Sequence, residues 1–129
     1  MIKKKIMFAL LLVFLLNSSL YCIKNLYIKN KCYKTIWICA IVKDYEGDWV
    51  HLGWYKLNPY GEEDSSVFLG SVKTSYFYIY ALLEDGSHFL KGGSKKRFKG
   101  KKKYPFKSVQ AKKRKQGWRV IWTYSLKCK

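Results

Sequence analysis

Short apolar and aromatic runs, separated by Gly, Asn, Asp and Pro, recur along most of the chain and predict strands rather than helices. Residues 35–43 are apolar almost throughout, which predicts a central strand covered on both faces. Residues 117–126 alternate between apolar and polar side chains, so one face should pack and the other should be mostly in water. Seven strands are expected, at residues 26–30, 35–43, 49–57, 67–72, 76–83, 87–91 and 117–126. The pattern predicts an all-β domain, either a small antiparallel β-sandwich or a partly open barrel.

The first 22 residues have the order of an export signal. Three lysines precede eleven residues without a polar side chain, and a short polar stretch follows. This order is typical of a signal peptide, and the apolar run is shorter than the ~20 residues that a transmembrane helix needs. We therefore expect a signal helix over residues 1–22, a single β domain over residues 23–129, and a periplasmic or secreted location. An uncleaved signal that anchors the protein in the inner membrane is the alternative.

The four cysteines predict a disulfide whose partners depend on the cleavage site. Cleavage after Ser19 keeps Cys22 in the mature chain, and cleavage after Cys22 removes it. Cys128 is the candidate for a disulfide to Cys22 or to Cys32 that ties the last strand to the first. Cys39 lies within an apolar run and is interpreted as a buried small hydrophobic residue.

The formal net charge of +18 is concentrated near the C-terminus. Residues 23–85 contain seven lysines and eight acidic residues, whereas residues 86–129 contain sixteen Lys and Arg and no acidic residue. Such asymmetry favours a polyanionic partner, although a solvated basic face without a dedicated partner has the same composition. The candidate anion-binding residues are Lys95, Lys96, Arg97, Lys99, Lys101, Lys102, Lys103, Lys112, Lys113, Arg114 and Lys115. Because like charges repel, residues 92–116 are expected to be open and mobile, with Tyr104, Pro105 and Phe106 as a docking point on the domain.

The sequence contains no recognisable catalytic or metal-binding constellation. His51 and His88 are the only histidines, and no Cys-x-x-Cys occurs. We expect His51 to be a partly exposed strand residue rather than a general base. We therefore predict no enzymatic activity, no metal and no cofactor, and we identify no small-molecule substrate.

Aromatic residues between positions 49 and 80 form either a stacking platform for sugar rings or part of the core. Gly53 lies within a predicted strand, which indicates a bulge or a close backbone approach. With its neighbours it also carries a family resemblance. The motif and platform residues are Asn30, Trp49, Gly53, Trp54, Tyr55, Tyr78 and Tyr80. On these residues, on Ile38 to Ala40 and on Pro59, residues 26–92 resemble a bacterial family known as domain of unknown function 1036. The resemblance implies a single exported or membrane-associated domain and no catalytic residue.

Three functional hypotheses follow. The first is a non-catalytic module of the cell envelope that binds an anionic lipid headgroup or glycan, with retention that falls steeply with salt and is abolished by truncation after Gly92. The second is a nucleic-acid-binding protein, because single-strand grooves combine basic clusters with aromatic residues. The third is a secreted toxin or hydrolase with a site around His51 and Trp54, which requires a carboxylate or thiol within hydrogen-bond reach of His51.

Overall fold

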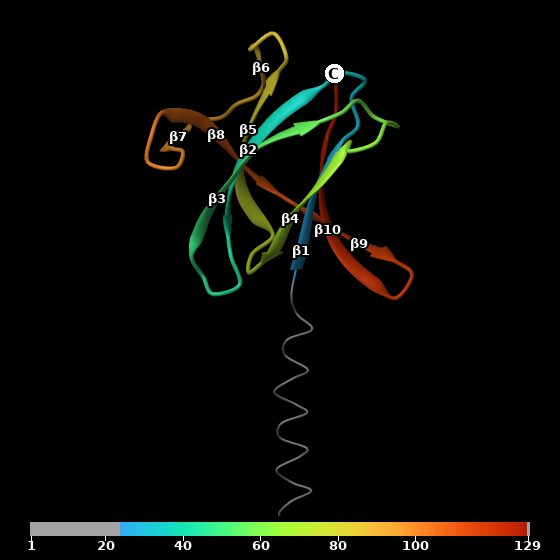
Figure 1. The fold of residues 1–129 in the computed structure, drawn as a ribbon. Helices are drawn as coiled ribbons and strands as arrows, with labels where there is room; N and C mark the ends of the chain where they lie inside the picture. Colours follow the sequence, from blue (N-terminus) through green and yellow to red (C-terminus); the bar gives the residue numbers. More distant parts are fainter. Residues whose placement is uncertain (1–23, 129) are drawn as a thin grey trace, which may run out of the picture.

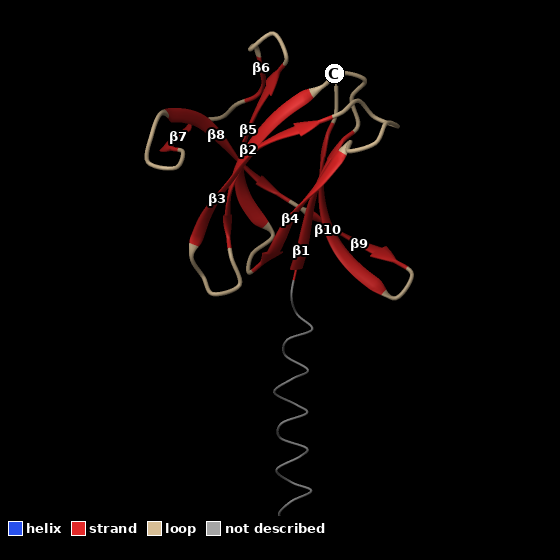
Figure 2. Ribbon diagram, viewed as in Figure 1, coloured by secondary structure: helices blue, strands red, loops and turns tan. Residues whose placement is uncertain are grey.

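The computed structural model describes residues 24–128, which form ten strands and no helix (Figures 1 and 2). The strands are β1 (Lys24–Asn30), β2 (Ile36–Lys43), β3 (Trp49–Leu57), β4 (Ser66–Val72), β5 (Tyr76–Leu83), β6 (His88–Leu90), β7 (Ser94–Arg97), β8 (Lys103–Gln110), β9 (Lys112–Gln116) and β10 (Arg119–Leu126). The all-β prediction is confirmed, and the seven predicted strands correspond to β1–β6 and β10. The predicted signal helix, with Cys22, lies outside the described residues. Residues 24–128 provide no helix that could cross a membrane.

The strands form two sheets that share one hydrophobic core. One sheet has the order β4-β1-β10-β9, and the other has the order β3-β2-β5-β8-β7 with β6 added to β5. Alternation along the strands decides which side chains enter the core: in β2, Ile36, Ile38 and Ala40 face the other sheet, whereas Cys39 and Ile41 face away from it. Both sets are buried, which confirms that the apolar run of β2 is covered on both faces.

The first and last strands are neighbours in the four-stranded sheet, and they run parallel. Their register places Asn30 opposite Leu126, so Cys32 and Cys128 follow at the same end of the pair. The two cysteines form a disulfide with a Cα–Cα distance of 5.2 Å. The prediction that Cys128 ties the last strand to the first is thereby confirmed, with Cys32 as the partner. The buried position predicted for Cys39 is also confirmed.

The prediction that residues 92–116 are open is wrong, because this segment forms β7, β8 and β9. Two aromatic side chains explain the difference: Phe98 is 5% exposed and Phe106 is fully buried, and both pack on the outer face of the six-stranded sheet. The lysines between them point mostly into water, where their repulsion is screened, so burial of the two rings outweighs it. After β8 the chain passes through the buried Ala111 into β9, which belongs to the other sheet.

The last strand packs on one face over only part of its length. Leu126 is buried at its end, but Trp118, directly before its first residue, is 91% exposed. The hairpin of β9 and β10 projects from the lower right of the molecule in Figure 1. The predicted alternation is therefore correct for the half of β10 that lies over the core, and it fails where the strand extends past it.

Candidate functional site

A bulge at Gly53 in β3 turns Trp54 to the outer face of the sheet, where Trp54 contacts the β7–β8 hairpin. The pairing of β2 with β3 shifts there, so that Tyr55 and Gly53 have partners and Trp54 is extra. Gly53 has φ of +124°, and a Cβ atom at this position would lie 2.9 Å from the carbonyl oxygen of Ile38. The predicted bulge and close approach are both confirmed. As a result, Tyr55 packs against the main core, while Trp54 packs on the outer face.

The turn of the β7–β8 hairpin is fastened to β3 through Phe98 and Lys99. The ring of Phe98 stacks on His51 with a centroid distance of 5.7 Å. The backbone N–H of Lys99 donates to Nδ1 of His51 at 2.7 Å, and the Lys99 ammonium donates to the carbonyl oxygen of Gly53 at 2.9 Å. The bond from Lys99 engages the His51 ring, and no carboxylate or thiol is bonded to His51 within residues 24–128. His51 thereby supports the turn of the hairpin.

Several of the aromatic residues considered as a platform form a second, smaller core on the outer face of the six-stranded sheet, together with residues of β8 and Phe98 from the β7–β8 turn. The Trp54 and Tyr104 rings lie 5.5 Å apart, and those of Tyr80 and Tyr104 lie 5.1 Å apart. Tyr80 is buried, and its hydroxyl shares a hydrogen bond of 2.9 Å with Nδ1 of His88. Burial raises the pKa of Tyr80, with smaller contributions from Cys39 and Tyr104. Trp54 and Tyr80 therefore belong to the core rather than to an open platform.

An aromatic groove remains beside this second core. Its volume is about 380 Å³, and it is lined by Ile41, Trp49, His51, Tyr78, Lys96 and Arg97. Trp49 is 42% exposed and lies 5.5 Å from the ring of Tyr78, while the ammonium of Lys96 sits 4.3 Å from the centre of that ring. The lining contains no acidic residue. The groove thus offers a ring surface bordered by a lysine and an arginine.

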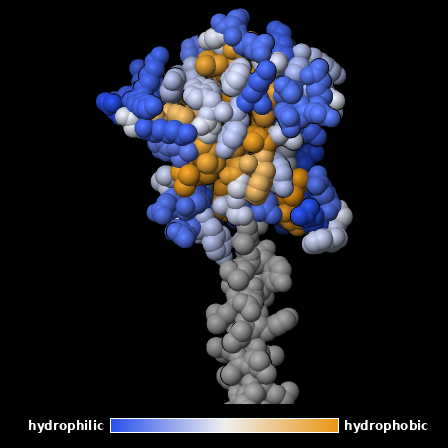
Figure 3. Space-filling model, in the orientation of Figure 1, coloured by the Kyte–Doolittle hydropathy of each residue, from blue (hydrophilic) through white to orange (hydrophobic). Residues whose placement is uncertain are grey.

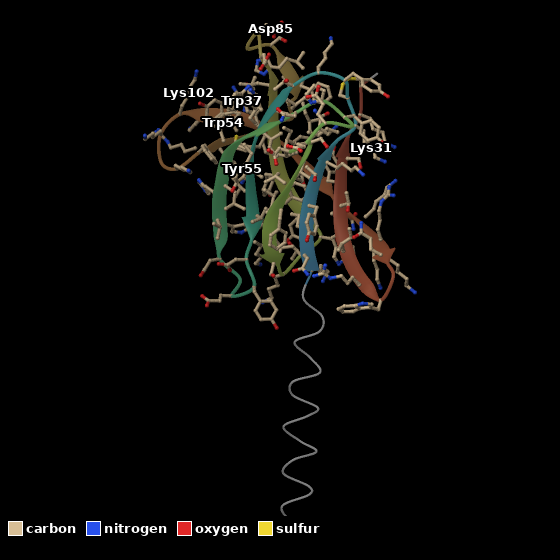
Figure 4. All side chains as sticks on the ribbon, turned by 45° about the vertical axis from the view of Figure 1, so that its right-hand side comes forward. Lys31, Trp37, Trp54, Tyr55, Asp85 and Lys102 are labelled. Atoms are coloured by element: carbon tan, nitrogen blue, oxygen red, sulfur yellow. A yellow bond between two sulfur atoms is a disulfide. The ribbon has the colours of Figure 1, made fainter. Side chains whose placement is uncertain are left out.

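The structure divides the eleven candidate cations between two hairpins. Those numbered 95 to 103 lie on the β7–β8 hairpin, and those numbered 112 to 115 lie on β9. The hairpins occupy opposite sides of the molecule in Figure 1, and the side chains seen in Figure 4 are arranged likewise, with Lys102 beside Trp54 and Lys31 on the other side. In Figure 3 hydrophilic side chains cover the projecting left-hand hairpin, and hydrophobic side chains cross the middle of the visible face. The basic segment therefore presents two separate surfaces.

Within the first hairpin the cations have different roles. Lys96 and Arg97 line the aromatic groove, and Lys99 is engaged with β3. The Lys102 ammonium lies 5.7 Å from the centre of the Tyr104 ring, and Lys102 is exposed, as are Lys95, Lys101 and Lys103. Lys96 and Arg97 are therefore the candidates of this cluster that border a recessed surface.

Asn30, the first residue of the family motif, is buried and structural. Its amide group donates to the carbonyl oxygens of Lys34 at 2.8 Å and Asn58 at 3.0 Å, and its side-chain oxygen accepts from the N–H of Cys32 at 2.8 Å. The side chain thereby connects the end of β1, the turn that follows it and the end of β3. The resemblance includes Asn30 but does not imply this structural role for it.

A second set of cations was not among the residues predicted from the sequence. Lys29 and Lys31, from the part of the chain with balanced charge, lie beside Arg114 on the four-stranded sheet. The signal that could have found them is the polar side of β1, because its alternate residues Leu26 and Ile28 are core residues. Without the pairing of β1 with β10, that side could not be placed next to the basic segment.

No family model, curated protein or solved structure matches this chain. The resemblance to domain of unknown function 1036 therefore stays a prediction. Among residues 24–128, no three His, Cys, Asp or Glu side chains come together in an arrangement that could hold a metal ion.

Proposed function

We propose that the protein is an exported, non-catalytic module of the cell envelope that binds an acidic glycan through the aromatic groove. The observation that carries the proposal is that Lys96 and Arg97 line the same groove as the partly exposed Trp49, in a lining without acidic residues. A sugar ring can stack on an indole face, and its carboxylate or sulfate can pair with the two cations. A simple lipid headgroup has no ring and would leave Trp49 unused.

Anchoring of the hairpin supports this function because it fixes the cations before binding. Phe98 and Lys99 hold the turn against β3. The hairpin is therefore already ordered, and ligand binding costs little further conformational entropy. The exposed lysines of the same hairpin add attraction at longer range, which raises the association rate and is weakened by salt.

Export is supported by the export-signal pattern of residues 1–22 and by the disulfide between Cys32 and Cys128, because disulfides persist in oxidising compartments. We expect protein recovered from the periplasm or medium to lack the signal segment and the two thiol hydrogens of the disulfide. Intact-mass measurement tests both. Recovery of the full-length chain from the cytoplasm would contradict export and favour nucleic-acid binding.

The glycan-binding proposal is tested by retention on immobilised polygalacturonate over a salt gradient. Truncation after Gly92, suggested by the sequence, is unsuitable because it also removes β8 and β10, which pair with β5 and β1. The substitution Lys96→Gln/Arg97→Gln should instead weaken binding by about tenfold or more, since charge-assisted bonds are lost. Trp49→Ala should also weaken retention, with a smaller change in its salt dependence because no charge is removed.

The matched control is Lys34→Gln/Lys56→Gln, which removes the same charge from two exposed residues outside the groove. Equal losses in the control and in Lys96→Gln/Arg97→Gln would show a general charge effect and contradict the assigned site. Retention that does not depend on salt would contradict the function itself. Stronger competition by single-stranded oligothymidine than by soluble polygalacturonate would replace the glycan with nucleic acid as partner.

A further inference from the structure

A second pocket, of about 300 Å³, lies on the outer face of the four-stranded sheet. The parallel register of β1 and β10 places Lys29 opposite Ser125, and the pairing of β1 with β4 places Ser66 on the other side of Lys29. The alternate residues of β1, Leu26 and Ile28, enter the main core, so this row of polar side chains faces away from it. The pocket is therefore a product of the sheet order.

Three cations from two distant parts of the chain line this pocket. Lys29 belongs to β1, Lys31 to the loop that follows it, and Arg114 to β9. Asp and Glu are absent from the lining. Burial lowers the pKa of Lys31, and the nearby positive charges of Arg114, Lys127 and Lys29 lower it further. The cations thus repel one another, and an anion placed among them would relieve that repulsion.

We propose that this pocket binds a phosphate group carried by a small polar moiety such as glycerol or a sugar. This goes beyond the proposed function, because the site lies on the other sheet, away from the aromatic groove, and takes a different ligand. Figure 4 shows Lys31 beside β1 and β10, on the side of the molecule opposite Trp54 and Lys102.

The donor set matches phosphate better than carboxylate. A guanidinium such as that of Arg114 can bond two phosphate oxygens at once, and lysines act as point charges beside it. Ser66, Ser125 and Gln116 supply further neutral donors in the same lining. A carboxylate has two oxygens and would leave part of this set unused. The volume lies at the lower end of the range of about 300–1,000 Å³ for small-molecule sites, which leaves room for the group that carries the phosphate.

The test is calorimetric titration with glycerol phosphate. It compares the exported protein, without further truncation, with its Lys31→Gln/Arg114→Gln variant. The matched control is Lys113→Gln/Lys115→Gln, which removes the same charge from β9. Those two residues pair with Trp122 and Val120 and are not in the pocket lining. We expect saturable binding by the wild type and by the control, and binding at least about tenfold weaker for the pocket variant.

A second arm separates a soluble phosphorylated ligand from a lipid headgroup. Phosphatidylcholine vesicles with and without phosphatidylglycerol are used in a sedimentation assay. Binding only to the anionic vesicles, lost in the pocket variant and kept in the control, would support the site with a headgroup as ligand. Equal losses in both variants, or no saturable binding to glycerol phosphate or vesicles, would overturn the proposal. Retention on polygalacturonate should be unchanged in the pocket variant, so failure of this site and failure of the glycan function can be told apart.

Discussion

Asn30 shows how one buried polar side chain can hold several segments together. In Asn30→Asp, the oxygen that accepts from Cys32 is kept, but the amide that donates to the carbonyls of Lys34 and Asn58 is lost. We expect the variant to lose about 3 kcal/mol of unfolding free energy, since two partly buried acceptors lose their donor and a charge is introduced at a fully buried position. Urea unfolding measures the change. Asn25→Asp, where the side chain accepts one exposed bond from Ser71, is the control and should change stability by less than about 1 kcal/mol.

Cys39 should make stability depend on alkaline pH. Burial raises the pKa of its thiol from 9.0 to about 12 in the folded protein. Above pH 9 the unfolded chain releases this proton while the folded chain keeps it, so unfolding becomes easier as the pH rises. The free energy of unfolding should fall by about 1 kcal/mol per pH unit between pH 9 and 11, measured relative to Cys39→Ala. That variant lacks the thiol and keeps every other titratable group. Parallel pH profiles for the two proteins would contradict a buried thiol.

At the scale of elements, Gly92 allows β8 to pass close to the chain that enters the basic hairpin. A Cβ atom there would lie 2.6 Å from Cα of Lys107, whereas a Cβ atom on the adjacent Gly93 would have no neighbour within 4 Å. We expect Gly92→Ala to cost about 2–3 kcal/mol, because backbone must move, and Gly93→Ala to change stability by less than about 1 kcal/mol. Thermal unfolding of the pair checks this. Similar stability for both variants would contradict the close approach.

The elements that the sequence predicts correctly are those with a clear apolar pattern, either continuous or alternating. The continuous run in β2 and the alternation in β5 follow from the need to bury one or both faces of a strand. The strands β7 and β9 escape the same reasoning because β7 carries mostly charged side chains and β9 is fully exposed. Phe98 and Phe106 hold this segment to the domain. Nothing in the sequence reveals that Phe98 contacts Trp54 and His51 of β3, or that Phe106 contacts Tyr80 of β5.

The candidate site could be predicted only in part, for a related reason. Charge counting finds Lys96, Arg97 and Arg114, but their partners in space come from strand pairing over long sequence separations. Trp49 was named among the aromatic residues, yet only the bulge at Gly53 places Trp54 on the same outer face as Trp49 and His51. Residue types thus indicate the chemistry, while the sheet order decides which of them meet.

For the whole molecule, the disulfide between Cys32 and Cys128 should contribute strongly to the free energy of unfolding. Cys32 and Cys128 are separated by 96 residues, and closing a loop of this length restricts the unfolded chain by about 4–5 kcal/mol. We expect Cys32→Ser/Cys128→Ser to lose a comparable amount in urea unfolding. Reductant should destabilise the wild type and leave the double variant unchanged. An unchanged wild type under reducing conditions, with free thiols verified by mass, would contradict this role.

The parallel pairing of β1 with β10 also sets the time at which the domain can fold. Ile28 has Val67 on one side and Tyr124 on the other, so the first strand obtains both of its neighbours only when nearly the whole chain is present. Contacts between such distant parts of a sequence form slowly, and a nascent chain cannot complete this sheet while it is still being synthesised. A chain that stays unfolded until its last strand emerges remains thin enough to be threaded through a narrow channel before it acquires its shape.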